Sequence, residues 1–577
     1  YVSKQWFIRM EPFKKGLIDA VRKKQLHIFP EKMENSYFRW IENIRDWCIS
    51  RQLVWGHQIP VWHSIKNPDT YICSDTNDPP KEVQNDPENW VRDQDVLDTW
   101  FSSALWPLST LGWPEKTSDL HTFYPTSVLI TGHDILFFWV SRMILMGKFL
   151  MKKVPFKEVF IHGLIYGRSY WREQNGMQIY VDAKEKTAFD QGKKLPKGVY
   201  SKWEKMSKSK GNVIDPIKVI AEYGTDAMRI ALASSLNSSG QIDLDPRVFA
   251  EERNFINKVW NSARFLFASI EDVSLSQGID PKLCTPEDHW LLYHLEKTTQ
   301  KTHDFLDAYA FEKAALLLQE FYWKSFCSIY LESVKPHLKT QRPRKTNKQT
   351  ILLIVFIHLL RLLHPFIPFI TEELFQSVKK RFSHLKFATK DPYTKDLLDS
   401  LDKEACMIAP YPKAISLKWI DPKAVEKMHL LQEMVYLIRN IRGDMQISPG
   451  EKITLHLEIK NPSFILTEED TIFLSSLIKI EQIQQSIPEK RPFGASCHLS
   501  MVEIFVPLPE HLQAKEKNRL KKEEDKLLRL AENLRFKLSN PSFRENAPQK
   551  VVQESERTLE NTLISIKEIQ KKFLELN

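Results

Sequence analysis

The residues best suited to chemistry form one short string, Lys205-Met206-Ser207-Lys208-Ser209, which continues as Lys210-Gly211-Asn212. Lysine ammonium groups are compact charges on flexible stems, so they can follow a phosphate group as it moves. We therefore predict a triphosphate site, in which Lys205 and Lys208 stabilise charge on the α-phosphate and on the departing pyrophosphate. Ser207 and Ser209 would supply hydroxyl groups. The alternative is an ordinary lysine-rich surface turn.

A second candidate follows a predicted strand. Residues 127–131 are short, apolar and β-branched, and Gly132 and Asp134 then lead into an apolar helix over 135–150. Glycine at a strand end permits close approach of a ligand, and a carboxylate can accept hydrogen bonds from ribose hydroxyls. The alternative is that Asp134 only caps the helix.

A further strand is predicted over Val159 to Ile161, followed by His162 and Gly163. The order strand, turn, helix, strand predicts a parallel α/β sheet, whose ligands bind at the carboxyl ends of the strands. Taken alone, His162 is a weak indication of a site.

The third candidate is the string Asp98-Thr-Trp-Phe-Ser102. If these residues alternate as in a strand, Asp98, Trp100 and Ser102 share one face, and Trp100 can wall a small apolar substrate pocket. A tryptophan buried in the core is the alternative.

Composition sets the context for these sites. The chain has 577 residues, 42% of them hydrophobic, with a net charge of +9, which predicts several globular domains and hints at a polyanionic partner. Its six cysteines form no CxxC pair, which favours reduced thiols in the cytoplasm. Because the first residue is Tyr1, we expect a piece of a longer protein. The apolar run from Ile351 to Ile370 predicts a buried bundle helix ending near His364 rather than a membrane span.

Beyond about residue 245 the hydrophobic period becomes 3.6, which predicts a helical bundle. Alternating strands are expected at 453–459 and 499–506. Leucines 520, 527 and 534 repeat at seven, as do Val552, Leu559, Ile566 and Phe573, with Ile569 and Leu576 beside them. Two such arms predict an antiparallel coiled coil.

Several strings together resemble the class I aminoacyl-tRNA synthetases, and among them the valyl-tRNA synthetases. They are Asp46-Trp-Cys-Ile-Ser-Arg-Gln52, Trp55-Gly-His-Gln-Ile-Pro60, Asp95-Val-Leu-Asp-Thr-Trp-Phe-Ser-Ser-Ala-Leu-Trp106, Leu111-Gly-Trp-Pro114, Thr131-Gly-His-Asp-Ile-Leu-Phe-Phe-Trp139, the lysine string, Leu363-His-Pro-Phe-Ile-Pro-Phe-Ile-Thr-Glu-Glu373, Arg439-Asn-Ile-Arg442 and Ile447-Ser-Pro449. The terminal coiled coil is a further likeness to bacterial-type valyl enzymes.

The resemblance implies ATP-dependent activation of valine and its transfer to tRNA(Val), with Mg²⁺ accompanying the ATP. It implies that Trp100 and Ile135 wall the valine pocket, Asp134 and Gly132 hold the ribose, and His162 and Leu164 lie by the adenine. For tRNA it implies contacts from the bundle and the coiled coil. The basic candidates are Lys335, Lys339, Arg342, Arg344, Lys345, Lys348, Arg439, Arg442, Lys521 and Lys522, and a solvated charged face is the alternative for each run.

The implied fold is α/β plus all-α, with the second half of a Rossmann-like nucleotide fold. The predicted parts are a return segment from an editing insertion (1–40), the nucleotide fold (41–166), a polar insertion (167–203), the lysine loop and stem-contact region (204–244), an anticodon-binding bundle (245–415), a mixed α/β region (416–511) and a coiled-coil arm (512–577).

The sequence departs from the family pattern in lacking the His-x-Gly-His string. We therefore expect a C-terminal fragment that is inactive alone and has no editing domain. Only Cys73 lies where some relatives carry cysteine pairs, so no structural zinc is expected. A cytoplasmic monomer without a membrane partner is the simplest expectation. The competing readings are an isoleucyl- or leucyl-type synthetase and a non-catalytic tRNA-binding protein derived from a synthetase.

Overall fold

The computed structural model describes residues 4–575 except 68, 77, 237–240, 271–277, 340–342, 383–390, 462–463, 490, 542 and 544–547. Two compact units divide the chain. The first comprises Tyr1–Asn254 with His303–Leu316, and the second comprises Phe255–Thr302 with Leu317–Asn577. Each unit is described by itself.

A three-stranded parallel sheet organises the first unit. Its order is β2 (His27–Phe29), β10 (Phe156–His162) and β9 (Thr126–Gly132). Both strands predicted from the apolar runs are therefore confirmed, as is their parallel pairing. Strand β2 lies before residue 41, so this sheet starts earlier than the predicted boundary of the nucleotide fold.

Helices bury the apolar residues of this sheet. Helices α1 (Glu11–Arg22) and α2 (Lys32–Glu42) share one hydrophobic core with the helical segment that follows β9. That segment runs without a break from His133 to Met151, through a 3₁₀ turn, two wide π turns and the α-helix α7 (Ser141–Met146). The predicted apolar helix is thus confirmed.

The prediction of a strand over 98–102 is wrong. These residues begin helix α4 (Thr99–Ala104), and Asp98 is its N-cap, whose Oδ1 accepts from the Trp100 amide at 3.4 Å. Asp98 is one of the residues that favour helix starts, and this local preference overrides the apparent alternation. Short helices and strands surround it, namely β3 (Trp47–Cys48), β4 (Ser50–Arg51), β8 (Val96–Leu97), α5 (Trp106–Ser109), α6 (Ser118–Phe123) and a sheet of β6 (Tyr71–Cys73), β5 (Val61–Ser64) and β7 (Trp90–Arg92).

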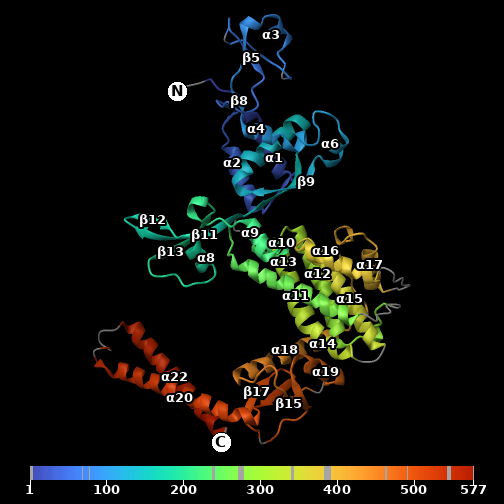
Figure 1. Cartoon of the computed structure of the whole chain (residues 1–577), viewed down its shortest axis with the longest axis vertical. Coiled ribbons are helices and arrows are strands. Elements are labelled where there is room, and N and C mark those ends of the chain that lie inside the picture. Colours follow the sequence, from blue (N-terminus) through green and yellow to red (C-terminus); the bar gives the residue numbers. More distant parts are fainter. Residues whose placement is uncertain are drawn as a thin grey trace. The chain divides into compact units, whose positions relative to one another are not determined.

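The predicted polar insertion forms a second sheet (Figure 1). Strand β11 (Leu164–Gln174) pairs antiparallel with β12 (Met177–Tyr180) and β13 (Val199–Lys205), and parallel with β14 (Gln241–Asp243). Helix α8 (Ala183–Asp190) covers one face, because Phe189 packs with Tyr170 and Val199. Helices α9 (Pro216–Tyr223) and α10 (Thr225–Ser235) follow β13.

The helical bundle consists of α11 (Arg247–Ser269), α12 (Pro286–Asp307), α13 (Phe311–Glu320), the π-helical stretch Phe321–Tyr330, α14 (Leu331–His337), α15 (Arg344–Leu363), α16 (Pro368–Phe382) and α17 (Pro392–Leu401). By length and composition, α15 alone among the described helices is apolar enough to cross a membrane. Its most apolar window is 94% buried inside the fold, so the prediction of a core helix ending near His364 is confirmed.

The remaining part joins a four-stranded sheet to two long helices. Helix α18 (Pro422–Asp444) and helix α19 (Glu468–Leu477) accompany strands ordered β16 (Ile480–Gln484), β15 (Ile453–Ile459), β18 (Val502–Pro507) and β17 (Gly494–His498). Helices α20 (Glu510–Ser539) and α22 (Gln549–Glu575) lie side by side (Figure 1) and run antiparallel, since Gln570 donates to Glu524 at 2.8 Å. Leu520 and Ile566 are buried, whereas Leu527, Leu534, Val552 and Leu559 are half-buried. The side chain of Phe573 and residue 576 lie outside the described part.

Candidate functional site

Four predicted site residues meet at the carboxyl end of the parallel sheet. Strands β9 and β10 end side by side, with Gly132 opposite His162. A Cβ placed on Gly132 would lie 2.7 Å from Asp134 Oδ1, 3.3 Å from Leu164 Cδ2 and 3.7 Å from His162 Cε1. We call this group, Gly132, Asp134, His162 and Leu164, the glycine cradle. Only glycine leaves this space open, at the sheet edge where α/β folds bind ligands.

Asp134 does not act as a helix cap. The N-cap position before the 3₁₀ turn belongs to Gly132, and no side chain caps it. The Asp134 side chain is exposed. Its carboxylate is therefore presented at the cradle as an acceptor for hydroxyl groups, which is the functional alternative.

The His162 ring has a defined tautomer. Its Nδ1 lies 2.9 Å from the carbonyl oxygen of Gly163. Because a carbonyl only accepts hydrogen bonds, Nδ1 carries a proton, which leaves Nε2 as an acceptor in the neutral ring.

Sequence reasoning missed a cavity of about 240 Å³ beside the cradle. It opens at the ends of β2 and β10, and Phe29, Phe160, His162 and Tyr309 contribute to its lining. The Tyr309 ring lies 4.9 Å from Phe29 and 5.3 Å from Phe160, centre to centre. Tyr309 comes from a segment far along the chain, so only the fold brings it here. Its position was marked in sequence by nothing more than the run Tyr309-Ala310-Phe311.

The lysine loop is held by one asparagine. Asn212 is fully buried, and its Oδ1 accepts from the Ser207 amide at 2.7 Å. Its Nδ2 donates to the carbonyls of Gly167, Glu204 and Lys205 at 3.3 to 3.4 Å. These bonds tie the two ends of the loop together and fix the loop on strand β11. Asn212 was not among the predicted site residues, although it directly follows Gly211 in the lysine string.

The three lysines of the loop differ in their partners. Lys210 forms an ion pair with Glu204, and the hydrogen bond that its ammonium group donates to this carboxylate raises the pKa of Lys210. Lys205 and Lys208 are exposed and form no ion pair in this fully described loop. The Ser207 and Ser209 hydroxyls are 2.8 Å apart and bond to each other. The loop therefore presents the positive charges of Lys205 and Lys208.

Strand β11 joins the cradle to the lysine loop. Leu164 begins the strand and contacts the cradle, Tyr166 pairs with Lys205, and Gly167 touches Asn212. Three residues of a strand span roughly 10 Å. One short, hydrogen-bonded element thus links the cradle, with its exposed Asp134 carboxylate, to the loop that carries Lys205 and Lys208.

The predicted apolar pocket residues are only partly brought together. Trp100 stacks on Phe138 with ring centres 6.2 Å apart, and Phe138 lies three residues after Ile135. Ile135 is half-buried. Asp98 instead points away to a buried cluster, where it accepts from the Trp47 indole at 3.0 Å and pairs with Arg51 and Arg142 at 3.1 and 3.2 Å. Ser102 donates to the Thr99 carbonyl within its own helix.

Two predicted tRNA contacts are buried in structural roles. Lys348 is fully buried against Glu287 and Asp288, with its Nζ 2.9 and 2.7 Å from their carboxylates. Arg442 is 5% exposed and donates to the carbonyls of Ser448, Glu451 and Lys479. Neither cation is accessible to a polyanion. The structure therefore corrects the prediction of a tRNA contact for both Lys348 and Arg442.

The other basic candidates differ in how freely their charge is presented. Lys345, Lys521 and Lys522 form no ion pair in the described chain, and Lys521 and Lys522 are exposed. Lys335 and Arg344 are engaged by Glu332 and Glu469, and Arg439 donates to the Leu477 carbonyl at 3.0 Å. Lys339 is exposed, and Arg342 lies outside the described residues.

Comparison with protein families gives three consecutive matches. Residues 1–169 and 199–245 match tRNA synthetases class I (I, L, M and V). Residues 288–459 match the anticodon-binding domain of tRNA ligase, and residues 513–576 match the valyl tRNA synthetase tRNA binding arm. The first match contains both the glycine cradle and the lysine loop.

Curated relatives align along the whole chain. A valine–tRNA ligase of Protochlamydia amoebophila is 46% identical over 100% of this chain and 62% of its own length. A valine–tRNA ligase of Chlamydia caviae is 42% identical over 99% of this chain and 61% of its own length. The chain therefore spans about three-fifths of the curated relatives that it matches.

Solved structures give weaker likenesses. An Agrobacterium radiobacter K84 LeuRS in a ternary complex with tRNA and LeuAMS has 18% identity and a TM-score of 0.43, covering 74% of this chain and 48% of that chain. A Mycobacterium tuberculosis methionyl-tRNA synthetase with methionyl-adenylate has 16% identity and a TM-score of 0.47, covering 64% of this chain and 62% of that chain.

Proposed function

We propose that this chain is part of a valine–tRNA ligase, a class I tRNA synthetase of the isoleucine, leucine, methionine and valine group. The family matches and the valine–tRNA ligases that align along the whole chain support this proposal. Members of this class bind ATP, and the fold joins a Rossmann-like catalytic region to a helical anticodon-binding domain. The observation that carries the proposal is β11, which joins the glycine cradle to the two free lysines. That arrangement suits one ATP molecule lying along the strand.

In this proposal the cradle holds adenosine and the loop holds phosphates. Gly132 gives clearance and the Asp134 carboxylate accepts from the ribose hydroxyls, with His162 and Leu164 beside the adenine. A carboxylate oxygen of valine attacks the α-phosphorus, the bond to the β-phosphate breaks, and pyrophosphate leaves. Lys205 and Lys208 stabilise the charge that shifts onto the leaving group. The loop itself offers lysines and hydroxyls rather than carboxylates, so Mg²⁺ would enter on the ATP phosphates and supply further charge neutralisation.

Trp100 and Ile135 are our candidates for the wall of the valine pocket. Their support is the stacking of Trp100 on Phe138, which belongs to the same helical segment as Ile135. An apolar wall of this kind accepts a branched aliphatic side chain and rejects charged ones.

For tRNA(Val), we propose contacts from the bundle and from the α20–α22 hairpin. The exposed lysines Lys521 and Lys522 are the leading candidates on α20, with Lys345, Lys335, Arg344 and Arg439 as further ones. Two helices with apolar residues repeating at seven support a coiled-coil arm, which matches a family described as a tRNA-binding arm. Phosphate contacts from lysine give salt-dependent affinity without reading the sequence.

We also propose that these 577 residues alone do not activate valine, because no His-x-Gly-His string occurs in them. Valine-dependent exchange between ATP and labelled pyrophosphate tests this directly. Robust exchange by the chain alone would contradict it. A monomer in the cytoplasm, without structural zinc, completes the proposal.

The valine assignment rests on the arm and on the curated relatives, which are named valine–tRNA ligases. A titration of the chain with tRNA(Val), with tRNA(Ile) as competitor, at two salt concentrations tests it. We expect a preference for tRNA(Val) that persists at the higher salt. Equal binding that disappears with salt would contradict it and favour a generic basic surface.

A further inference from the structure

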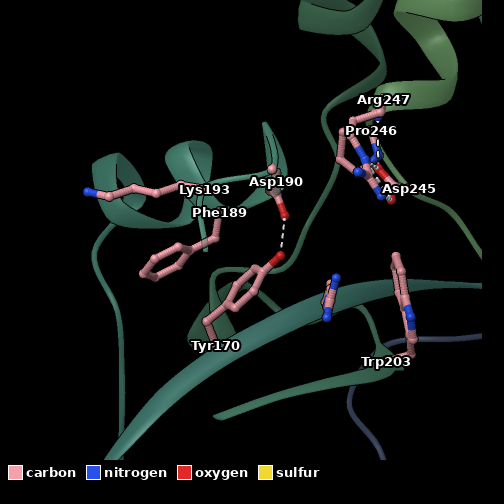
Figure 2. Close-up of a pocket in the computed structure, with 10 residues that line it drawn as sticks. Tyr170, Phe189, Asp190, Lys193, Trp203, Asp245, Pro246 and Arg247 are labelled. Carbon is pink, nitrogen blue, oxygen red and sulfur yellow. Dashed lines mark hydrogen bonds and ion pairs between the residues drawn. The ribbon is translucent and has the colours of Figure 1, made fainter. Parts of the chain in front are cut away.

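One ordered segment has no part in the proposed function. The match to the synthetase family stops at residue 169 and resumes at residue 199. Residues 170–198 nevertheless supply half of β11, all of β12 and helix α8. Together with the matched residues they enclose a cavity of about 210 Å³ (Figure 2).

Aromatic rings line this cavity. Tyr170 and Phe189 come from the unmatched segment and pack with ring centres 5.2 Å apart. Trp203 comes from β13, where it pairs with Arg168 of β11. Because side chains alternate along a strand, Arg168, Tyr170 and Trp203 share the face of the sheet that α8 covers. Figure 2 shows Tyr170 and Trp203 at the floor, below Asp190 and Asp245.

The two carboxylates at the rim are already engaged. Asp190 accepts from the Tyr170 hydroxyl at 3.0 Å and pairs with Lys186. Asp245 is chelated by Arg247, whose Nε lies 3.0 Å from Oδ1, and this bond holds the pKa of Asp245 below its ordinary value. The acids therefore leave the cavity no free negative charge.

Arg168 and Lys193 differ from Arg247, the third cation of the cavity, in forming no ion pair with a described carboxylate. The Arg168 guanidinium lies 5.5 Å from the Tyr170 ring centre and 5.8 Å from that of Trp203, and one N–H donates to Ser201 Oγ at 3.1 Å. Lys193 lines the cavity and is exposed. Neither forms an ion pair in residues 164–205, all of which are described, or with Asp245. Three other lysines of the segment are also exposed and without an ion pair there, namely Lys184, Lys194 and Lys197.

We propose that this cavity binds one unpaired nucleotide of tRNA, with the base against Trp203 and the phosphate held by Arg168 and Lys193. Proteins that bind single-stranded nucleic acids combine aromatic faces, on which bases stack, with cations that contact the phosphates. Cavities for drug-sized ligands measure about 300–1,000 Å³, so this one suits a single base-sized group rather than a whole cofactor. The inference rests on the proposed function for the identity of the polynucleotide. Of the three residues named, Arg168 and Trp203 lie inside the ranges that match the synthetase family, and Lys193 lies outside them.

The test uses the 577-residue chain and filter binding of tRNA(Val). Trp203→Leu removes the stacking face and should weaken binding about tenfold. Lys193→Ala should weaken it severalfold and reduce the slope of log affinity against log salt by about one. Tyr200→Leu is the matched control, because Tyr200 lies on the opposite face of the same sheet, stacked on Trp171. This control should bind within about twofold of the unaltered chain.

The outcomes are separable. If both pocket variants bind as tightly as the Tyr200→Leu control, the pocket proposal is overturned. Thermal unfolding checks that Trp203→Leu is folded, and Lys193→Ala, which changes an exposed side chain, decides the question if it is not. An unaltered chain that fails to prefer tRNA(Val) over tRNA(Ile) contradicts the proposed function instead. In that case the loss of affinity in the pocket variants is measured for total tRNA binding, and it still shows whether the cavity binds tRNA.

Discussion

The backbone carbonyl oxygen of Asn212 occupies the space where a side chain on Gly167 would begin. Asn212 is also the residue whose side chain ties the start of the lysine loop to its end. The positions of Lys205 and Lys208 thus depend on a glycine in a neighbouring strand and on a buried amide. Neither residue contacts a substrate in our proposal, yet both set where the lysines lie.

Replacing Asn212 with alanine should release the loop. The change removes four hydrogen bonds, and buried groups that lose a partner cost about 1–3 kcal/mol each to leave unsatisfied. We expect trypsin to cleave after Lys205 or Lys208 at least several times faster. The melting temperature of the whole chain should fall only slightly, because the loss is confined to the loop. Asn43→Ala is the control, since Asn43 is exposed and its side chain, among the described residues, donates only to the Arg39 carbonyl. Unchanged cleavage would show that the loop is held by something else.

A side chain at Gly132 should close the glycine cradle. The new Cβ of Gly132→Ala would lie 2.7 Å from Asp134 Oδ1, closer than such atoms approach, so the carboxylate must move. We expect adenosine binding to weaken about tenfold or more, since displacing a positioned group by 1 Å costs that order. Gly443→Ala is the matched control, because its Cβ meets nothing within 4 Å and the residue is helical. Equal adenosine binding by both variants would place the nucleoside elsewhere.

Some elements and residues could be predicted from the sequence, and others depend on contacts that only the fold creates. The strands β9 and β10 and the core helix α15 follow from local apolar patterns, because burial of a whole element leaves a continuous signal. The strand expected at 98–102 failed because a cap at Asp98 outweighs alternation over five residues. The predicted tRNA contact of Lys348 was wrong for another reason. Its partners Glu287 and Asp288 lie about sixty residues away in the sequence, and a count of charges does not show which of them pair. Tyr309 was missed because only the fold carries it to the sheet.

The buried cluster around Lys348 should be costly to break. Burial alone would lower the pKa of Lys348, but Asp288 and Glu287 outweigh it and raise that pKa. Removing one member of such a cluster leaves charges unpaired, so Lys348→Met should destabilise the bundle by about 3–5 kcal/mol in urea denaturation. Lys345→Met, three residues away and without an ion pair in the described chain, should change stability by less than about 0.5 kcal/mol. A small effect of Lys348→Met would mean that the carboxylates are solvated or neutral.

The bundle should also lose stability in acid. Burial raises the pKa of Asp396, but hydrogen bonds from His358 and Arg361 outweigh it and lower that pKa from 3.8 to about 2. A carboxyl group whose pKa is lower in the folded chain than in the unfolded chain stabilises the folded state at any pH above the unfolded pKa. This contribution is lost as the pH falls from about 4 to 2. Melting temperatures across this range should fall more steeply for the unaltered chain than for Asp396→Asn. Parallel curves would exclude Asp396 as a source of the acid sensitivity.

The measurement closest to the central claim compares ATP with adenosine in calorimetric titrations of the chain. If one ATP lies along β11, Asp134→Ala should weaken both ligands, whereas Lys208→Ala should weaken ATP about tenfold and leave adenosine unchanged, because only ATP reaches the loop. Lys210→Ala controls for the loss of a lysine from the same loop, since Lys210 is already paired with Glu204. Adenosine binding that falls equally with Lys208→Ala, or ATP binding that ignores Lys208, would contradict the account.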